Sequence, residues 1–174
     1  MYYVIQVKTG NEQKVIGKIN NLEGRIHDYD AFVPCRKTLR KYKGEFKPVI
    51  ERCFPGYVFV ETNHPKELFF DLSKIEEFTR LLGREGLSYN FNPLNENESR
   101  TIDILYGKDT HRVTDLSLVK VEEGKTIRIL TGPLENIKGT IKKVNLHKRK
   151  VTVSITLMNR SVDIDVGIGI VTRE

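Results

Sequence analysis

Tryptophan is absent from this chain of 174 residues, and cysteine and methionine occur only twice each. The two cysteines, Cys35 and Cys53, are too few for a disulfide framework, and no second pair offers the spacing of a zinc site. The four histidines are scattered and form no pair with ligand spacing. We therefore expect two ordinary buried thiols, no metal ion and no cofactor.

Long apolar runs are also missing, and the chain begins with a strand-like segment instead of a basic stretch followed by an apolar one. A helix that spans a membrane needs about 20 mostly apolar residues. We therefore expect no signal peptide, no membrane span and a location in the cytoplasm.

The sequence motifs of common enzyme classes do not occur either. There is no phosphate-binding GxxxxGK[ST] loop, no HExxH zinc motif, no nucleophile elbow and no cluster of catalytic carboxylates. Asp163 and Asp165 share one face of an expected strand, but their alternation with apolar residues fits an exposed strand better. We expect a protein that is not an enzyme and has no catalytic residues.

Positive charge, in contrast, is in excess. The chain has 29 Lys and Arg against 23 Asp and Glu, which gives a net charge of +6 and a pI of about 9.3. This balance favours nucleic acid or another acidic partner, although many basic proteins bind neither. A hydrophobic content of 39% is enough for one domain or two small ones.

The first hundred residues alternate between strand and helix signals. Expected strands include 2–8, the segment from Asp28, 57–61 and 77–82. Between them, apolar residues recur at helical spacing from Val15 to Leu22, with Gly24 expected to end the helix, and again from Pro65 to Ile75. Asn95 and Glu98 approximate a capping box for a third helix. This order predicts helices packed on an antiparallel sheet.

The strand after the Pro55–Gly56 turn signal is central to this pattern. Tyr57 and Phe59 share one face of it, and Val58 and Val60 share the other. The aliphatic face suits a core. The aromatic face either meets a partner or is covered by the protein itself, and the sequence leaves both possibilities open.

A basic hairpin is expected between residues 36 and 52. Seven cations stand there against Glu45 and Glu51, and Lys43–Gly44 is typical of a hairpin tip. Such a hairpin either touches a phosphate backbone or is simply solvated, and the sequence favours neither.

After a polar stretch at residues 107–120, helical spacing disappears. Short runs in which apolar and polar residues alternate, separated by turn signals, predict a small all-β barrel. Within it, residues 138–150 contain six Lys and Arg and no acid, with His147 among them. We favour a phosphate-binding surface here over an ordinary polar loop.

Several of these segments resemble one family. The run Phe54-Pro55-Gly56-Tyr57-Val58-Phe59-Val60 is similar to the FPGY-V-V signature of NusG transcription elongation factors, and residues 2–7 resemble that family's opening strand. Gly132-Pro133-Leu134 and Lys138-Gly139-Thr140-Ile141 are similar to its KOW motif. The resemblance implies an α+β protein: an N-terminal antiparallel α/β sandwich at 1–107, a linker at 108–120 and an all-β KOW barrel at 121–174.

The resemblance also implies partners. The family's N-terminal domain rides on the clamp helices of RNA polymerase, with Tyr57 and Phe59 matching aromatic positions in the contact pocket and Phe78 and Leu82 lying near further pocket positions. The basic hairpin would lie near upstream or non-template DNA. The residues implied for that DNA contact are Lys37, Arg40, Lys41 and Lys43.

The KOW half departs from the general family pattern, because Met158-Asn159-Arg160 replaces a Phe-Gly-Arg turn that helps to bind a ribosomal protein or Rho. The Gly-Pro-Leu turn, the basic run and the ending Val166–Val171 look more like LoaP-type paralogues, which implies processive antitermination and binding of a nascent RNA hairpin. The residues implied for RNA are Lys138, Lys142, Lys143, His147, Lys148, Arg149, Lys150 and Arg160.

Two other interpretations stay open at this point. A general NusG-type factor would couple polymerase to the ribosome or to Rho without specific RNA recognition. A translation-associated KOW protein would not bind polymerase at all. In each case we expect a monomer that does not bind a membrane.

Overall fold

The computed structural model describes residues 1–171, apart from the side chain of Thr79, and the chain forms two compact units. The first unit comprises Met1–Pro34 and Phe54–Ser99, and the second comprises Cys35–Cys53 and Arg100–Glu174. The basic hairpin interrupts the first unit in sequence but belongs to the second. The division into domains 1–107 and 121–174 stays a prediction, and residues 172–174 of the latter lie outside the described residues.

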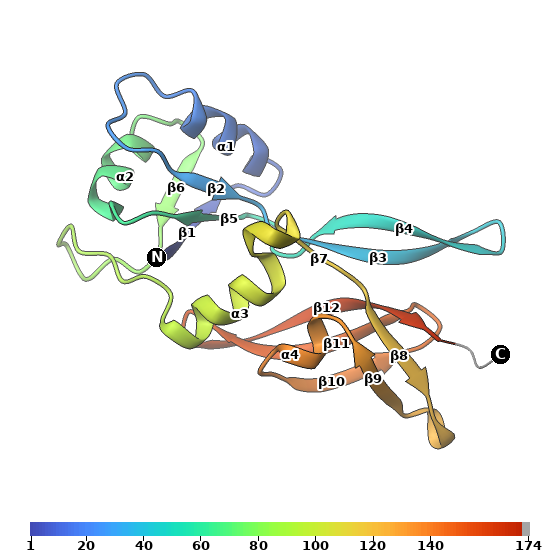
Figure 1. Ribbon diagram of the computed structural model, residues 1–174. Helices are drawn as coiled ribbons and strands as arrows, with labels where there is room; N and C mark the ends of the chain where they lie inside the picture. The colour runs from blue at the N-terminus through green and yellow to red at the C-terminus, as the bar shows by residue number, and fades with distance from the viewer. Residues whose placement is uncertain (172–174) are drawn as a thin grey trace. The chain divides into compact units, whose positions relative to one another are not determined.

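The first unit is built on an antiparallel sheet, as the sequence pattern predicts, with four strands in the order β2-β5-β1-β6. Its strands are β1 (Tyr2–Val7), β2 (Asp30–Phe32), β5 (Tyr57–Glu61) and β6 (Phe78–Leu81). Helices α1 (Glu12–Asn20) and α2 (Pro65–Leu72) lie on one side of this sheet (Figure 1). Among residues 1–171, no helix is long and apolar enough to cross a membrane.

The middle residues of β5 are buried on both faces. Val58 and Val60 on the aliphatic face have no exposed surface, and Phe59 on the aromatic face is 1% exposed. The ring of Phe59 packs 5.9 Å from that of Phe32 and 5.5 Å from that of Phe54, measured between centroids. Burying such a side chain contributes roughly 1.5–3 kcal/mol. The sequence signal for β5 is therefore confirmed, and on its aromatic face Phe59 belongs to the protein interior whereas Tyr57 is half-buried.

The helix ends show one confirmed prediction and one correction. Helix α3 (Glu96–Tyr106) begins with the expected capping box: the Glu98 amide donates to Asn95 Oδ1 at 2.9 Å, and the Asn95 amide donates to Glu98 Oε2 at 3.0 Å. Helix α1 ends at Asn20, well before Gly24. The backbone leaves helical geometry at Asn21, with φ of −104° and ψ of 10°, and the side-chain amide of Asn21 caps the carbonyl of Gly17.

The second unit begins with the basic hairpin, formed by β3 (Cys35–Tyr42) and β4 (Glu45–Arg52). Lys43 and Gly44 join the strands with φ of 48° and 89°, the positive values that a tight hairpin turn requires. The predicted tip is thus confirmed. A short strand, β7 (Val113–Thr114), pairs in parallel with β3.

The rest of the second unit is a five-stranded sheet in the order β10-β11-β12-β8-β9, which bears out the predicted β module. Its elements are β8 (Ser117–Val121), β9 (Ile127–Thr131), α4 (Pro133–Asn136), β10 (Thr140–Asn145), β11 (Lys150–Leu157) and β12 (Arg160–Ile170), with single 3₁₀ turns at Lys108–Thr110 and Glu123–Lys125. The alternation in β11 is confirmed: Val151, Val153, Ile155 and Leu157 are all buried. Residues 108–120, expected as a linker, include β7 and all of β8 except its last residue, Val121.

The hairpin packs directly against β12 at Gly167. A side-chain carbon at this position would lie 2.4 Å from the carbonyl oxygen of Lys37 and 3.2 Å from the α-carbon of Thr38. Only glycine permits this approach of two backbones. Because Gly167 also pairs with Lys150 on β11, the contact places the hairpin beside the start of that strand.

Candidate nucleic-acid and partner interfaces

A tight turn at residues 146–149, called here the basic turn, joins β10 to β11. The Lys148 amide donates to Asn145 Oδ1 at 2.9 Å, and the Arg149 amide donates to the Leu146 carbonyl at 3.3 Å. Arg149 adopts a φ of 52°, which closes the turn. The side chains of His147 and Lys148 are exposed. The turn therefore presents cations at one end of the sheet.

Strand β10 carries two further cations next to this turn. The pairing register with β11 shifts between Ile141 and Lys143, so Lys142 is the extra residue of a β-bulge. Lys143 pairs with Thr152, and both lysines are exposed. A bulge re-aims its side chain away from the regular alternation, which allows both consecutive lysines to reach solvent.

Lys150 differs from its neighbours because its charge is paired. Its ammonium lies 2.5 Å from Asp165 Oδ2, and the Thr152 hydroxyl donates to Asp165 Oδ1 at 2.7 Å. Burial acts to raise the pKa of Asp165, but the hydrogen bonds from Lys150 and Thr152 hold it below its ordinary value. Residues 138–150 contain no acidic residue, but the fold places Asp165 of β12 beside them.

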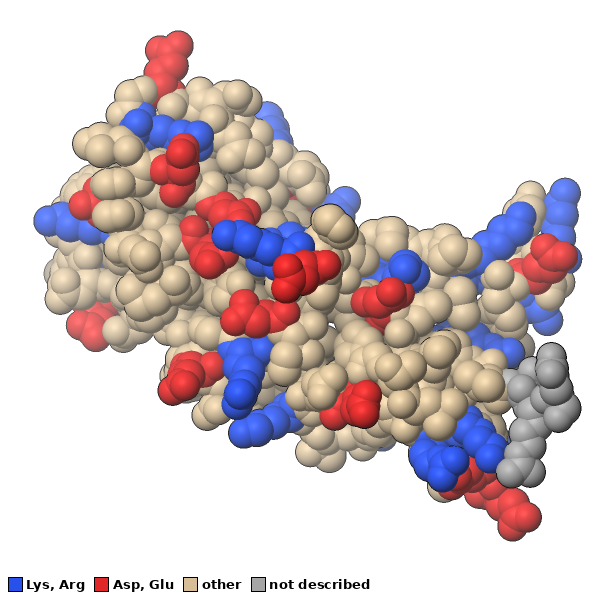
Figure 2. All heavy atoms as spheres, in the orientation of Figure 1, with Lys and Arg blue, Asp and Glu red and all other residues tan. Residues whose placement is uncertain are grey.

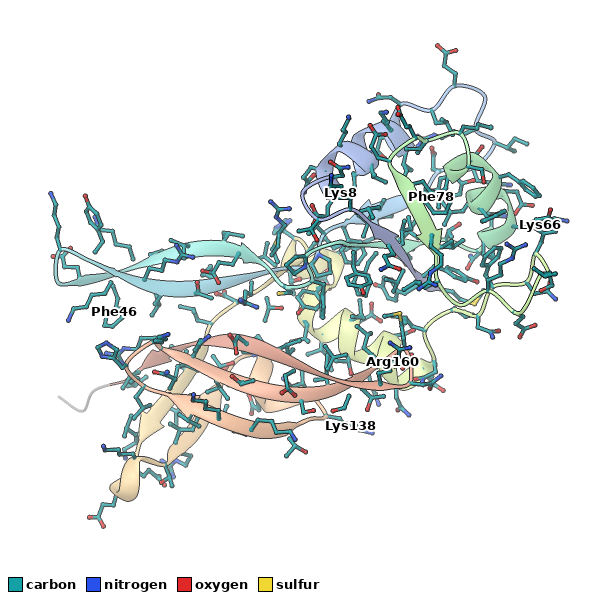
Figure 3. All side chains as sticks on the ribbon, turned by 180° about the vertical axis from the view of Figure 1, so that it is seen from behind. Lys8, Phe46, Lys66, Phe78, Lys138 and Arg160 are labelled. Atoms are coloured by element: carbon teal, nitrogen blue, oxygen red, sulfur yellow. The ribbon has the colours of Figure 1, made fainter. Side chains whose placement is uncertain are left out.

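The eight predicted RNA-binding residues do not form a single patch. Strand β11 runs from Lys150 to Leu157, so the turn before Arg160 lies at the opposite end of the sheet from the basic turn. Figure 3 shows Lys138 and Arg160 towards that far end. The structure brings together Lys142, Lys143, His147, Lys148, Arg149 and Lys150, and leaves Lys138 and Arg160 apart.

Two aromatic residues near the hairpin tip were not singled out by sequence reasoning. The guanidinium carbon of Arg149 lies 4.7 Å from the ring centroid of Phe46 on β4. On β3, the ring of Tyr42 has the ammonium groups of Lys43 and Lys47 at 5.5 and 5.3 Å from its centroid. Both are cation–π distances. An aromatic residue within a basic segment was the signal that could have found them.

The four cations predicted to contact DNA fall into two groups. Two of them are in ion pairs: Lys37 pairs with Asp115 at 2.7 Å, and Arg40 pairs with Glu51 at 2.6 Å. Nearer the tip, Lys41 and Lys43 are exposed. Figure 2 shows Lys and Arg side chains gathered around the tip of the β3–β4 hairpin. The electropositive part of the hairpin is therefore its tip.

The predicted polymerase-contacting residues also divide. Tyr57 pairs with Gln6 on β1, and Gln6 accepts a hydrogen bond from Arg80 at 3.1 Å, so these three form one row across the sheet. Leu82 follows β6 on the same face by alternation, and both Tyr57 and Leu82 are half-buried. Phe59 lies on the same face but has almost no exposed surface.

Phe78 has a different environment. It pairs with Val7 of β1, and its ring packs edge-on against Phe69 of α2 at a centroid distance of 6.4 Å. Phe69 in turn contacts Phe70, Tyr89 and Phe91. This aromatic cluster, with Phe70 and Tyr89 43% and 48% exposed, is a second surface feature that sequence reasoning missed.

The cysteines and histidines carry no obvious chemistry. Cys35 and Cys53 are not joined in a disulfide, and burial raises the pKa of each thiol, so both are protonated at neutral pH. Among residues 1–171, one group of three potential metal ligands occurs, His27, His64 and Glu67. The two imidazoles are stacked at 3.5 Å with planes 4° apart. The nitrogen lone pairs of parallel rings do not converge on a common ion, so we propose no metal site.

Comparison with known proteins gives a consistent result. A family model described as transcription termination factor NusG matches residues 1–103. The transcription termination/antitermination protein NusG of Bacillus subtilis is 28% identical over 171 residues, covering 94% of this chain and 93% of the relative. The protein of the same description from Helicobacter pylori is 25% identical over 171 residues, covering 95% and 93%.

A solved structure shares the fold. It comes from work on domain interaction in Thermotoga maritima NusG, and it aligns with a TM-score of 0.56 at 23% identity, covering 95% of this chain and 92% of that one. This likeness concerns the architecture alone.

Proposed function

The chain belongs to the NusG family of transcription termination and antitermination factors, and from this premise we propose that it is a processive antitermination factor that binds RNA polymerase and nascent structured RNA. Factors of this family are transcription factors and not enzymes. The proposed polymerase contact is with the clamp helices, through the first unit. The proposed RNA contact is with a hairpin, through the sheet of the second unit.

The observation that carries the RNA proposal is the convergence of cations at the basic turn. Lys142, Lys143 and Lys148 are exposed side chains within one end of one sheet, and Arg149 extends the group towards the hairpin tip. Lys and Arg contacts to phosphate provide affinity but no sequence choice. Recognition of one RNA then requires its shape or its unpaired bases.

For polymerase, Tyr57 and Leu82 are the proposed direct contacts, because they are half-exposed on one face of the first sheet. Phe59, on the same face of β5, is buried and packs against Phe32 and Phe54. Phe78 would contribute to a contact only at the other face of the sheet, beside the aromatic cluster of α2. An aromatic anchor of this kind supplies much of the affinity of a protein interface.

The tethering of two contacts in one chain supports the mechanism. Once the first unit is bound to polymerase, the second unit meets emerging RNA at a high effective concentration. The factor would act as a monomer in the cytoplasm, where it stays with the elongating enzyme. A LoaP-type role in a specific operon is the form of this proposal that the basic run favours.

A general NusG-type role is the alternative. In that case the Met158–Asn159 turn and Arg160 would bind a ribosomal protein or Rho. Met158 and Asn159 have φ of 52° and 57°, so the turn is tight and places Arg160 in an exposed position at the start of β12. Met158 stands where the family has an aromatic residue, so this turn lacks a stacking surface, which weighs against a ribosomal protein or Rho as its partner.

The experiment uses the full chain and a panel of labelled RNA stem–loops with scrambled controls, measured by fluorescence anisotropy over a salt series. We expect one stem–loop to bind more tightly than its scrambled form at moderate salt. Lys142→Glu and Lys148→Glu should weaken this binding, whereas Lys66→Glu, an exposed lysine on α2, should not. Weak binding that is equal for all RNAs and collapses with salt would contradict the proposal.

A further inference from the structure

The contact between Arg149 and Phe46 joins two basic elements that are far apart in sequence. Phe46 belongs to the hairpin tip, residues 41–47, and Arg149 belongs to the basic turn. The close approach of Gly167 to the backbone of Lys37 holds the hairpin against β12. Both contacts lie within the second compact unit. The fold of this unit therefore places the hairpin tip next to the basic turn.

The faces of the hairpin show how the tip is arranged. Phe46 pairs with Lys41 across the two strands, so both side chains lie on the face where Arg149 is found. Tyr42 pairs with Glu45 and lies on the opposite face, with Lys43 and Lys47 near its ring. The Tyr42 side chain is 57% exposed. One aromatic ring thus fixes the tip, and the other is presented to solvent.

Charge reinforces this arrangement. The hairpin tip and the basic turn together carry five cations, Lys41, Lys43, Lys47, Lys148 and Arg149, against the single carboxylate of Glu45. Figure 3 places Phe46 at the far end of the hairpin, away from Lys138 and Arg160. A cationic surface that contains an exposed aromatic ring is the combination that binds single-stranded nucleic acid, because bases stack while phosphates are held.

We infer that the RNA-binding surface extends from the basic turn around the end of the hairpin tip, and that it takes unpaired loop nucleotides of the RNA, which pass from the face of Lys41 to the face of Tyr42. Tyr42 stacks on a base, and Lys41, Lys43, Lys47 and Lys148 hold the flanking phosphates. Arg149 keeps the tip in place through Phe46. The hairpin, predicted from sequence to touch DNA, then serves the same RNA as the C-terminal sheet.

This inference rests on the proposed RNA-binding function but makes a separate claim. The proposed function requires only that the lysines of β10 and the basic turn hold RNA. The inference requires in addition that an aromatic ring on the hairpin, more than a hundred residues earlier in the chain, touches the same molecule. The two claims can therefore fail independently.

The test uses the full chain and three labelled probes: an RNA stem–loop with an adenine-rich loop, the same stem as a blunt RNA duplex, and single-stranded DNA of the loop sequence. The variants are Tyr42→Ala and Lys43→Glu on the tip and Lys143→Glu on β10. Tyr89→Ala and Lys66→Glu, at exposed positions of the first unit, are the matched controls. Circular dichroism melts verify that each variant is folded.

Tyr42→Ala is expected to weaken stem–loop binding about tenfold, because stacking on an aromatic ring contributes substantially to each base contact. The same variant should leave blunt-duplex binding unchanged. Lys43→Glu should lower the slope of log affinity against log salt by about 0.7 or more, the share of one phosphate contact. Neither control should change binding of the stem–loop.

Four results are decisive. Loss of stem–loop binding in Tyr42→Ala and Lys43→Glu, with both controls intact, supports the inference. Loss in Lys143→Glu alone overturns it while the proposed function stands. Tip variants that weaken DNA binding but not RNA binding overturn it in favour of a DNA contact. Failure of the unaltered chain to bind the stem–loop above the duplex overturns the inference together with the proposed RNA function.

Discussion

The carboxylate of Glu12 accepts a hydrogen bond from the amide of Gly56 at 2.7 Å, although the two residues are 44 positions apart. The other carboxylate oxygen accepts from the amide of Gly10 at 2.9 Å. Glu12 has no exposed surface. One buried side chain at the start of α1 therefore ties together the turn after β1 and the turn before β5, which fixes the entry of the central strand.

The first prediction concerns this link. Glu12→Gln replaces one acceptor oxygen by an amide that cannot accept, so one buried backbone N–H loses its partner. Such a loss costs about 1–3 kcal/mol, and more where the bond involves a charge. We expect the free energy of unfolding, measured in urea, to fall by about 2 kcal/mol. Glu23→Gln, at an exposed position, is the control, and an equal effect of the two variants would disprove the role of the link.

The second prediction concerns the turn itself. Gly56 has a φ of 86°, and a side-chain carbon there would lie 3.1 Å from Thr9 Oγ1 and 3.3 Å from the Val7 carbonyl oxygen. Gly86 also has a positive φ, 55°, but open space around it. Gly86→Ala therefore reports the backbone strain alone, about 1–2 kcal/mol. Gly56→Ala should lower the midpoint of thermal unfolding further, because the contacts add to the strain.

The third prediction concerns pH. Glu77 has its pKa lowered to about 2, because Lys14 and Lys18 both contact its carboxylate at 2.6 Å. Its unfolded pKa is about 4.3. A carboxylate with a lowered folded pKa stabilises the protein above the unfolded value and loses that contribution as the pH falls towards 2.

Urea unfolding from pH 7 to pH 2 should therefore show Glu77→Gln less stable than the unaltered protein at neutral pH. The difference should shrink as the pH falls below about 4. Glu76→Gln, at the exposed neighbouring position, is the comparison. A stability difference that is constant over this range would show that the ion pairs are not its source.

The fourth prediction concerns polymerase. Tyr57→Ala removes the half-exposed ring of the proposed contact, while the buried Phe59 keeps its core packing. In a pull-down with core RNA polymerase, we expect Tyr57→Ala to reduce binding at least tenfold, as truncation of an aromatic anchor does. Tyr42→Ala, an exposed tyrosine of the hairpin, should retain binding. Retention by both variants would move the contact elsewhere, with the aromatic cluster of α2 as the next surface to test.

The fifth prediction uses the ion pair that only the structure reveals. Asp165→Asn removes the carboxylate that pairs with Lys150, so one more cation faces the nucleic acid. We expect steeper salt dependence of RNA binding and tighter binding at low salt. Asp163→Asn makes the same change in net charge at an exposed position and should have a smaller effect. Equal effects would mean that overall charge, not Lys150, is responsible.

Much of the local structure was readable from sequence because it depends on neighbouring residues. The capping box of Asn95 and Glu98, the Lys43–Gly44 turn and the alternation of β11 are all interactions or preferences within a few positions. The family signature around Pro55–Gly56 is likewise a pattern of neighbouring residues. The sequence places the end of α1 too late, at Gly24. In the structure the side-chain amide of Asn21 caps the helix three residues earlier.

The candidate surfaces needed the tertiary structure. The sequence by itself determined the alternating elements, the turn positions and the clustered lysines, since these follow from local conformational preference and composition. Only the tertiary structure decided that Phe59 is buried, that Asp165 offsets Lys150, that Arg160 lies far from the basic turn, and that Phe46 meets Arg149. Each of these depends on which distant strands pair and in which register, and that is set by the packing of the whole unit.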